Sequence, residues 1–179
     1  MGLLDKLRDA IVAKEISSVP ESLPIQSEEG VLYAPVTGRV VSMSAVPDPA
    51  FSEGLLGAGC GIWPESEIVF APVTGTLTVL MGHAVGLVSD DGIEVLVHVG
   101  MDTVSLEGKG FVPYVAQGER VSAGQPLLSF SRKAIAEAGY EDCVVLVVTN
   151  TASFDDVELV ATPESDIVAG SAAIRVLRS

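Results

Sequence analysis

The chain has two histidines, His83 and His98, and they are its strongest candidates for chemistry at neutral pH. An imidazole ring has an ordinary pKa of about 6.5, so it can act as a nucleophile, carry a proton or bind a metal ion. His83 follows Gly82, and His98 lies two residues before Gly100. Small neighbours of this kind keep the backbone low and allow another molecule to approach the rings.

Two β-type runs carry the histidines, at 82–88 and 93–100, and the Ser-Asp-Asp-Gly sequence at 89–92 favours a hairpin turn between them. A two-residue turn centred on the Asp-Asp pair places His83 directly opposite His98. A turn centred on the following Asp-Gly pair makes them diagonal neighbours on the same face. Either register predicts two imidazoles that can share a ligand, whereas an odd-sized loop without a bulge would send them to opposite faces.

The same alternation predicts two faces for this hairpin. One face is expected to pack in the interior and consists of Ala84, Gly86, Val88, Ile93, Val95, Val97 and Val99. The other is expected to be exposed and consists of His83, Val85, Leu87, Glu94, Leu96 and His98. This exposed face would be apolar enough to dock another protein.

Composition restricts what such a face could bind. The 179 residues include 10 basic and 24 acidic side chains, a net charge of −14, so the chain would repel nucleic acid and favours a partner that is basic where it docks. The mean hydropathy is +0.47, but charge, Gly or Pro interrupts every apolar run before the ~20 residues of a spanning helix. Cys60 and Cys143 show no metal-ligand spacing and are expected to be buried free thiols.

Three segments follow one another along the chain. Residues 1–15 place their Leu, Ile and Val side chains on one side of a helical wheel, which predicts an amphipathic helix. Charges interrupt it too early for a signal peptide, and Lys6 stands where an N-myristoylation motif needs Ser or Thr. This segment is either a membrane-surface anchor, or a frayed tail or a helix that covers the domain's edge. Residues 16–30 are expected to be a linker, and 31–179 a single domain.

The domain is expected to be all-β. From Val31 onward, runs of Val, Ile and Leu are bounded about every 8–12 residues by Gly, Pro and Asp. The exception is 131–139, where Ser131 can cap a short helix and Gly139 can end it. The sequence Ala-Pro-Val-Thr-Gly at 34–38 recurs at 71–75, which predicts a duplicated strand-turn unit with a tight turn or close backbone approach at its glycine.

Several motifs resemble one known family. The run Val-Leu-Val-His-Val-Gly at 95–100, followed by Met101, Thr103 and Val104, resembles the signature of glucose-family IIA phosphocarriers of the bacterial sugar phosphotransferase system. The N-terminal Met-Gly-Leu-Leu-Asp-Lys-Leu resembles the first helix of the free-standing glucose-specific member. The resemblance extends over most of the chain, at 34–38, 46–48, Phe51, 70–73, 83–84 and 108–111.

This resemblance implies an antiparallel β-sandwich of the barrel-sandwich-hybrid type, a duplicated hybrid motif with short helices. It implies that His83 is phosphorylated, that His98 is its partner and that transfer requires no cofactor. The donor would be phosphorylated HPr, and the acceptor a cysteine on the IIB domain of a glucose-type permease. The protein would be cytoplasmic, with weak contact to the inner face of the plasma membrane through its N-terminal helix. Regulatory targets such as glycerol kinase or sugar permeases stay open.

Phosphoryl transfer needs positioned groups and charge stabilisation more than a metal ion or a strong base. A neutral His83 is a competent nucleophile, and His98 could donate a hydrogen bond to the phosphate. Backbone N–H groups near Gly100 could donate others. One departure from the family pattern is Met81, where Thr is common, so support for His98 has to come from another group.

Four further residues could serve this site. Asp102 could orient His98 or face an arginine on HPr, and Asp48 could also face that arginine; each could equally be a turn carboxylate. Phe51 and Leu55 could belong to the docking surface, although Phe51 could equally belong to the core.

Two other classes of protein compete with this interpretation. Lysostaphin-type zinc peptidases have a related all-β fold and bind zinc through two histidines and an aspartate, but they would need a histidine where this chain has Gly100. Biotinyl and lipoyl carriers share the hairpin texture of 118–128, but they modify a lysine in a tight hairpin, and Lys109 lacks the flanking residues. Zinc could still bind at His83 and His98 if a partner added a carboxylate.

Overall fold

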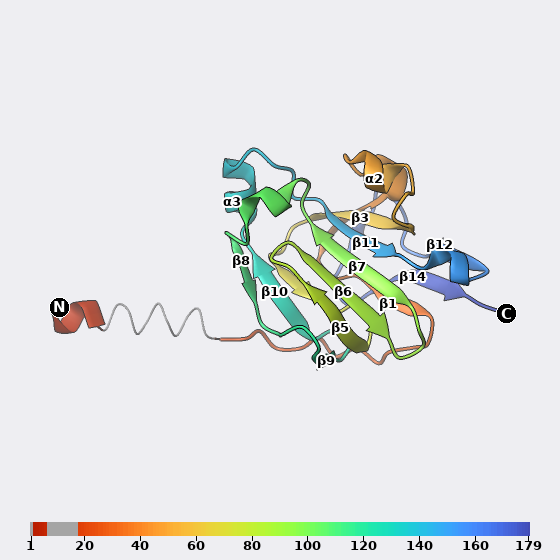
Figure 1. The fold of residues 1–179 in the computed structure, drawn as a ribbon, viewed down its shortest axis with the longest axis horizontal. Helices are drawn as coiled ribbons and strands as arrows, with labels where there is room; N and C mark the ends of the chain where they lie inside the picture. The colour runs from red at the N-terminus through yellow and green to blue at the C-terminus, as the bar shows by residue number, and fades with distance from the viewer. Residues whose placement is uncertain (1, 7–17) are drawn as a thin grey trace.

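The structure is a computed structural model that describes residues 2–6 and 18–179. Within these ranges the chain forms fourteen strands, paired antiparallel in three sheets, and a few short helices (Figure 1). The all-β prediction is therefore confirmed. No helix in this part of the chain has both the length and the apolar character needed to cross a bilayer.

The strands are β1 (Val31–Tyr33), β2 (Gly38–Ser42), β3 (Ala58–Pro64), β4 (Ile68–Phe70), β5 (Gly75–Leu80), β6 (Ala84–Ser89), β7 (Glu94–Val99), β8 (Phe111–Pro113), β9 (Arg120–Val121), β10 (Pro126–Phe130), β11 (Val144–Val148), β12 (Asp156–Leu159), β13 (Asp166–Ile167) and β14 (Ala172–Leu177). The helices are η1 (Met43–Ala45), α2 (Pro49–Ser52), η2 (Thr103–Leu106), α3 (Arg132–Glu137) and η3 (Thr151–Ser153), where η marks a 3₁₀-helix.

The sheets are built from two equivalent halves. The large sheet has the order β13-β2-β3-β11-β7-β6-β5-β9, and the small sheets have the orders β1-β14-β12 and β4-β10-β8. Reading each order shows that β1, β2, β3, β11, β12, β13 and β14 correspond to β4, β5, β6, β7, β8, β9 and β10. The second half is inserted into the first between β3 and β11, and the halves meet where β7 pairs with β11. The predicted duplication is therefore confirmed and extends far beyond the five-residue repeat.

Each Ala-Pro-Val-Thr-Gly copy accepts a hydrogen bond from the residue that precedes the other copy. The N–H of Tyr33 donates to the carbonyl of Pro72 at 2.9 Å, and the N–H of Phe70 donates to the carbonyl of Pro35 at 2.9 Å. The threonine hydroxyl of each copy accepts a backbone hydrogen bond at 2.9 Å. The two copies therefore make matched contacts, and the threonine has the same role in each.

Strand β11 lies at the centre of the core. Each of its residues is fully buried, and it pairs with β3 on one side and β7 on the other. A smaller apolar cluster, separate from the main core, consists of Val41, Val46, Phe51, Met101, Cys143, Val145 and Val147. Cys60 and Cys143 are buried free thiols, as predicted, and burial raises the pKa of each to about 12.

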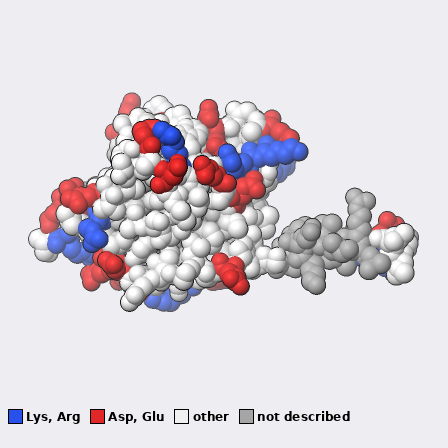
Figure 2. Space-filling model, turned by 180° about the vertical axis from the view of Figure 1, so that it is seen from behind, with Lys and Arg blue, Asp and Glu red and all other residues white. Residues whose placement is uncertain are grey.

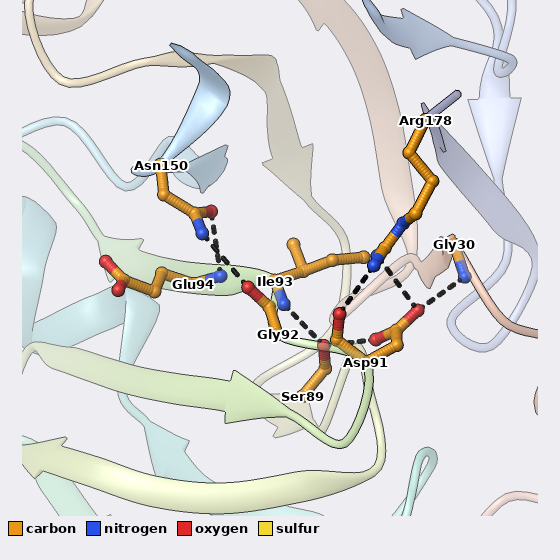
Figure 3. A network of polar contacts seen from close by, with 8 residues as sticks. All are labelled: Gly30, Ser89, Asp91, Gly92, Ile93, Glu94, Asn150 and Arg178. Carbon is orange, nitrogen blue, oxygen red and sulfur yellow. Dashed lines mark hydrogen bonds and ion pairs between the residues drawn. The ribbon is translucent and has the colours of Figure 1, made fainter. Parts of the chain in front are cut away.

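A polar network fixes the turn between β6 and β7 (Figure 3). The Oγ of Ser89 accepts a hydrogen bond from the N–H of Ile93 at 2.8 Å, and its hydroxyl donates to the carboxylate of Asp91. That carboxylate also accepts from the N–H of Gly30 at 2.8 Å and lies 3.4 Å from the guanidinium of Arg178. The turn is therefore tied to residues near both ends of the domain.

The predicted short helix is α3. Ser131 caps it by accepting a hydrogen bond from the N–H of Ala134 at 3.0 Å, and Gly139 follows it with a φ of +83°. The predicted N-terminal helix at 1–15 falls largely outside the described residues, although 3–6 are helical. In the predicted linker, 18–28 have neither helix nor strand, and the N–H of Leu23 donates to the carbonyl of Gly124 at 2.9 Å.

Alanine at either repeated glycine should destabilise the fold. A Cβ on Gly38 would lie 2.0 Å from the carbonyl oxygen of Trp63, and one on Gly75 would lie 2.1 Å from the carbonyl oxygen of Val88. Relief requires movement of a strand, so each substitution should lower the free energy of unfolding by ~2 kcal/mol or more, measured by urea denaturation. In the control Gly139→Ala the Cβ meets open space, and the left-handed backbone should cost about 1 kcal/mol. Equal losses in all three variants would contradict the close approach.

Candidate functional site

The strands of the histidine hairpin pair in a register that lies between the two expected ones. Val88 pairs with Glu94, and Ala84 pairs with His98. The turn therefore contains three residues, 90–92, instead of two, and the polar network of Figure 3 holds it in that form.

This register reverses the expected faces of β6. Its core-facing residues are Val85 and Leu87, which lie in the main core with Val95, Val97 and Val99. The other face consists of Ala84, Gly86, Val88, Glu94, Leu96 and His98. The prediction for β7 is therefore confirmed, and the prediction for β6 is wrong by one residue, because a single extra turn residue inverts every side chain of a strand.

The two imidazoles nevertheless lie side by side, because His83 lies outside β6. Gly82 and His83 form the two-residue turn between β5 and β6, where the flanking residues exchange backbone hydrogen bonds of 2.9 and 3.3 Å. From this turn the ring of His83 reaches that of His98, with centroids 5.0 Å apart and planes at 78°. The N–H of Val99 donates to the carbonyl of His83 at 2.7 Å, which ties the turn to β7.

Gly82 allows this turn to pack tightly against the loop that follows η2. A Cβ at Gly82 would lie 2.7 Å from the Cα of Gly108, which has a φ of +82°. The loop therefore braces the His83 turn through a contact between two backbones. This role of Gly108 was not predicted; the available signal was its spacing from Gly110, since two glycines around one lysine are typical of a tight turn.

Phe51 supports the other imidazole. Asp48 caps helix α2, because its carboxylate accepts a hydrogen bond from the N–H of Ala50 at 2.8 Å. Phe51 is buried, and its ring centroid lies 5.2 Å from that of His98, with the planes at 60°. Phe51 is therefore a core residue that also packs edge-on against the site. Leu55, on the loop after α2, is exposed.

Both imidazoles favour their neutral form at pH 7. Burial lowers the pKa of His83, which is 8% exposed. Burial, and next the charge of His83, lower the pKa of His98, and these effects outweigh the opposite influence of the Gly100 backbone, Asp48 and Asp102. The Nδ1 atom of His98 is buried and has no hydrogen-bond partner among the described residues.

The backbone at the end of β7 is already paired. The N–H of Gly100 donates to the carbonyl of Cys143, and the N–H of Met101 donates to the carbonyl of Glu141, each at 2.9 Å. The N–H groups of Gly100 and Met101 are therefore not free for a phosphate, because this segment continues to pair with the chain that precedes β11. That other N–H groups near Gly100 donate to a phosphate stays a prediction.

Asp102 and Met81 give His98 no hydrogen bond. Asp102 is exposed with a φ of 59°, and within 2–6 and 18–179 no hydrogen bond joins its carboxylate to the ring. The predicted orientation of His98 by Asp102 is therefore not found, and the carboxylate acts on the ring through its charge. Met81 is 49% exposed and offers a thioether where the family commonly has a hydroxyl.

The histidine pair does not form a metal site by itself. Among the described residues no three His, Cys, Asp or Glu side chains gather where they could hold a metal ion. Zinc usually takes four ligands in a structural site and three protein ligands in a catalytic one. A carboxylate from a partner would therefore have to complete any zinc site here.

Charge is dispersed over the face of the molecule that Figure 2 shows. On the face seen in Figure 2, acidic and basic side chains lie near one another around a broad uncharged area, without a continuous positive surface. Several of the basic groups are neutralised in exposed ion pairs, namely Arg39–Glu164, Arg120–Asp90 and Arg132–Asp142.

His83→Gln should raise the pKa of His98, because it removes a neighbouring group that can carry positive charge. NMR titration measures this, with Lys133→Gln on α3 as the control. In the wild type both rings should titrate below 6.5, so the unfolded chain binds more protons than the folded one. The free energy of unfolding should then fall as the pH drops through about 6.5, and fall less in the variant. An unchanged His98 midpoint would refute the electrostatic coupling.

Comparisons with known proteins agree with this geometry. Residues 30–154 match the family model described as phosphoenolpyruvate-dependent sugar phosphotransferase system, EIIA 1. The solved structure of glucose permease IIA from Mycoplasma capricolum superposes with a TM-score of 0.75 at 30% sequence identity, over 85% of this chain and 98% of that one.

Two relatives show how this domain occurs elsewhere. The PTS system glucose-specific EIIA component of Bacillus cereus is 36% identical over 135 residues, which cover 74% of this chain and 82% of that protein. The PTS system beta-glucoside-specific EIIBCA component of Bacillus subtilis is 42% identical over 123 residues, which cover 68% of this chain. The chain spans only 20% of the length of that relative. The chain therefore belongs to the EIIA 1 family of the phosphoenolpyruvate-dependent sugar phosphotransferase system.

Proposed function

We propose that the chain accepts a phosphoryl group from phosphorylated HPr on its histidine pair and passes it to a cysteine on the IIB domain of a glucose-type permease. The observation that carries this proposal is the pair of neutral imidazoles, whose ring centroids lie 5.0 Å apart. Relatives named EIIBCA, which join an EIIA to an EIIB component in one chain, support a IIB partner.

Within the pair we propose that His98, in place of His83, forms the N–P bond. His98 is half-buried, whereas His83 is buried, at 8% exposed. His98 also belongs to a strand that is paired on both sides, with β6 and β11, so its ring has a fixed base. Because its Nδ1 is buried, Nε2 is the nitrogen that a partner can reach.

Transfer would then take two displacement steps at phosphorus. A proton on Nδ1 of His98 leaves the lone pair on Nε2, which attacks the phosphorus of the donor. The new N–P bond forms as the bond between phosphorus and the donor breaks, and the leaving atom of the donor keeps that electron pair. In the second step a cysteine thiolate forms an S–P bond, and His98 leaves as a neutral imidazole. His83 donates a hydrogen bond to the phosphate oxygens in both steps.

The partner surface would surround this pair. Asp48 and Asp102 act on His98 through their charge, and they would face basic side chains of HPr, in keeping with the net charge of −14. Met81 and Val104 add apolar surface, at 49% and 56% exposed. Regulatory targets such as glycerol kinase or a sugar permease would compete for the same surface.

The roles of the two histidines can be separated by labelling. With phosphoenolpyruvate, Enzyme I and HPr, His98→Ala should take up no phosphate, whereas the wild type gains one acid-labile, base-stable phosphate by intact mass. His83→Ala should still be phosphorylated, but its single-turnover transfer to IIB should slow on the order of 10²-fold, because one preorganised donor is lost. His83→Gln, which keeps an N–H donor, should be slowed less.

Two outcomes of this labelling would correct the proposal. Phosphate on His98→Ala with none on His83→Ala would return the acceptor role to His83, as the family resemblance suggested. Full labelling of a variant that lacks both histidines would refute the site itself.

We also propose that the protein is cytoplasmic and makes weak contact with the membrane through its N-terminal segment. Leu3 and Leu4 are 77% and 82% exposed, as the apolar face of a surface-binding helix would be. Deletion of residues 1–15 should reduce cosedimentation with vesicles rich in anionic lipid and leave acceptance from HPr unchanged. Equal vesicle binding by both forms would contradict the membrane contact and favour a segment that only covers the edge of the domain.

A further inference from the structure

The backbone of Val99 connects both histidines to one buried hydroxyl group. Val99 follows His98 directly, and its N–H donates to the carbonyl of His83 at 2.7 Å. Its own carbonyl accepts a hydrogen bond from the hydroxyl of Thr103 at 2.5 Å. Thr103 is fully buried, so this bond has no competition from water, and its loss would leave a buried carbonyl without that partner.

The same side chain shapes the turn that follows His98. Gly100 has a φ of +78° and Asp102 a φ of 59°, so two residues of this turn are left-handed. A Cβ on Gly100 would lie 2.4 Å from the Cγ2 of Thr103 and 3.0 Å from the carbonyl oxygen of Glu141. The methyl group of Thr103 therefore fills the space that the missing Cβ leaves, while its hydroxyl closes the turn.

This turn bears on the chemistry of His98. The backbone of Gly100 raises the pKa of His98 and so opposes burial, which lowers it. A residue that fixes Gly100 therefore sets part of the environment of His98. Through Val99 it also sets where the His83 turn is attached to β7.

We propose that Thr103 is a positioning residue for phosphoryl transfer, which holds the His83 and His98 rings in their mutual arrangement through the backbone of Val99. It acts through the turn and not by contact with the phosphate. The proposal rests on the proposed function of the histidine pair, and it adds a residue that the chemistry alone would not identify.

Three variants test this role. Thr103→Val keeps the shape and removes the hydroxyl, and its single-turnover acceptance from HPr should fall about tenfold or more, within the ~10²-fold that misplacement of a reacting group can cost. Thr103→Ser keeps the hydroxyl and should retain most of the wild-type rate. The matched control is Thr151→Val, since the hydroxyl of Thr151 donates to the carbonyl of Val148 at 2.6 Å near η3. The control should lose stability without slowing transfer.

NMR titration gives a second readout that needs no phosphoryl donor. In Thr103→Val the pKa of His98 should fall further, because the Gly100 backbone is released, and in Thr151→Val it should stay at the wild-type value. If Thr103→Val does not fold, Thr103→Ala takes its place in both measurements.

The outcomes separate this proposal from the function on which it rests. A wild-type rate in Thr103→Val, a Thr103→Ser rate as low as that of Thr103→Val, or a His98 pKa that does not move would each overturn the role of Thr103. A wild-type chain that accepts no phosphate would refute the proposed function, and the titration would still decide whether Thr103 positions His98.

Discussion

The antiparallel pairing of β7 with β11 joins the two halves of the molecule, and the position of each functional side chain depends on it. The pairs run from Val99–Val144 to Val95–Val148, and β11 is buried throughout. A strand enclosed in this way cannot slip by one residue without turning its apolar side chains away from their partners. His98, which pairs with Val145, therefore has a fixed place on the opposite side of the sheet from the main core.

The class of fold could be predicted because its signals are local. Short apolar runs between Gly, Pro and Asp clusters indicate strands wherever they occur, and Ser131 and Gly139 mark the ends of one helix through their own capping chemistry. The duplication was visible because the close approaches at Gly38 and Gly75 tolerate no side chain, so both copies carry the same residue.

The register of the histidine hairpin could not be predicted, because it is decided by residues far apart in the sequence. A Ser-Asp-Asp-Gly turn permits loops of two or three residues, and the three-residue form is held by Asp91 through its contacts with Gly30 and Arg178. The same distance effect hid the backbone pairing of Gly100 with Cys143. The histidines were correctly expected to be neighbours, but His83 reaches His98 from a turn and not from the strand.

The two-fold duplication raises the question of how many phosphoryl groups one chain can carry. Ala58 is the equivalent of His83: it pairs with Val148, as the carbonyl of His83 pairs with the N–H of Val99. Val147, which is buried, is the equivalent of His98. The first half thus has aliphatic side chains where the second has imidazoles, and Val147 is enclosed in the same cluster as Phe51. Although its two halves are equivalent in fold, the chain therefore has one histidine pair. In the proposed function it carries one phosphoryl group, and a partner can dock on it in one orientation.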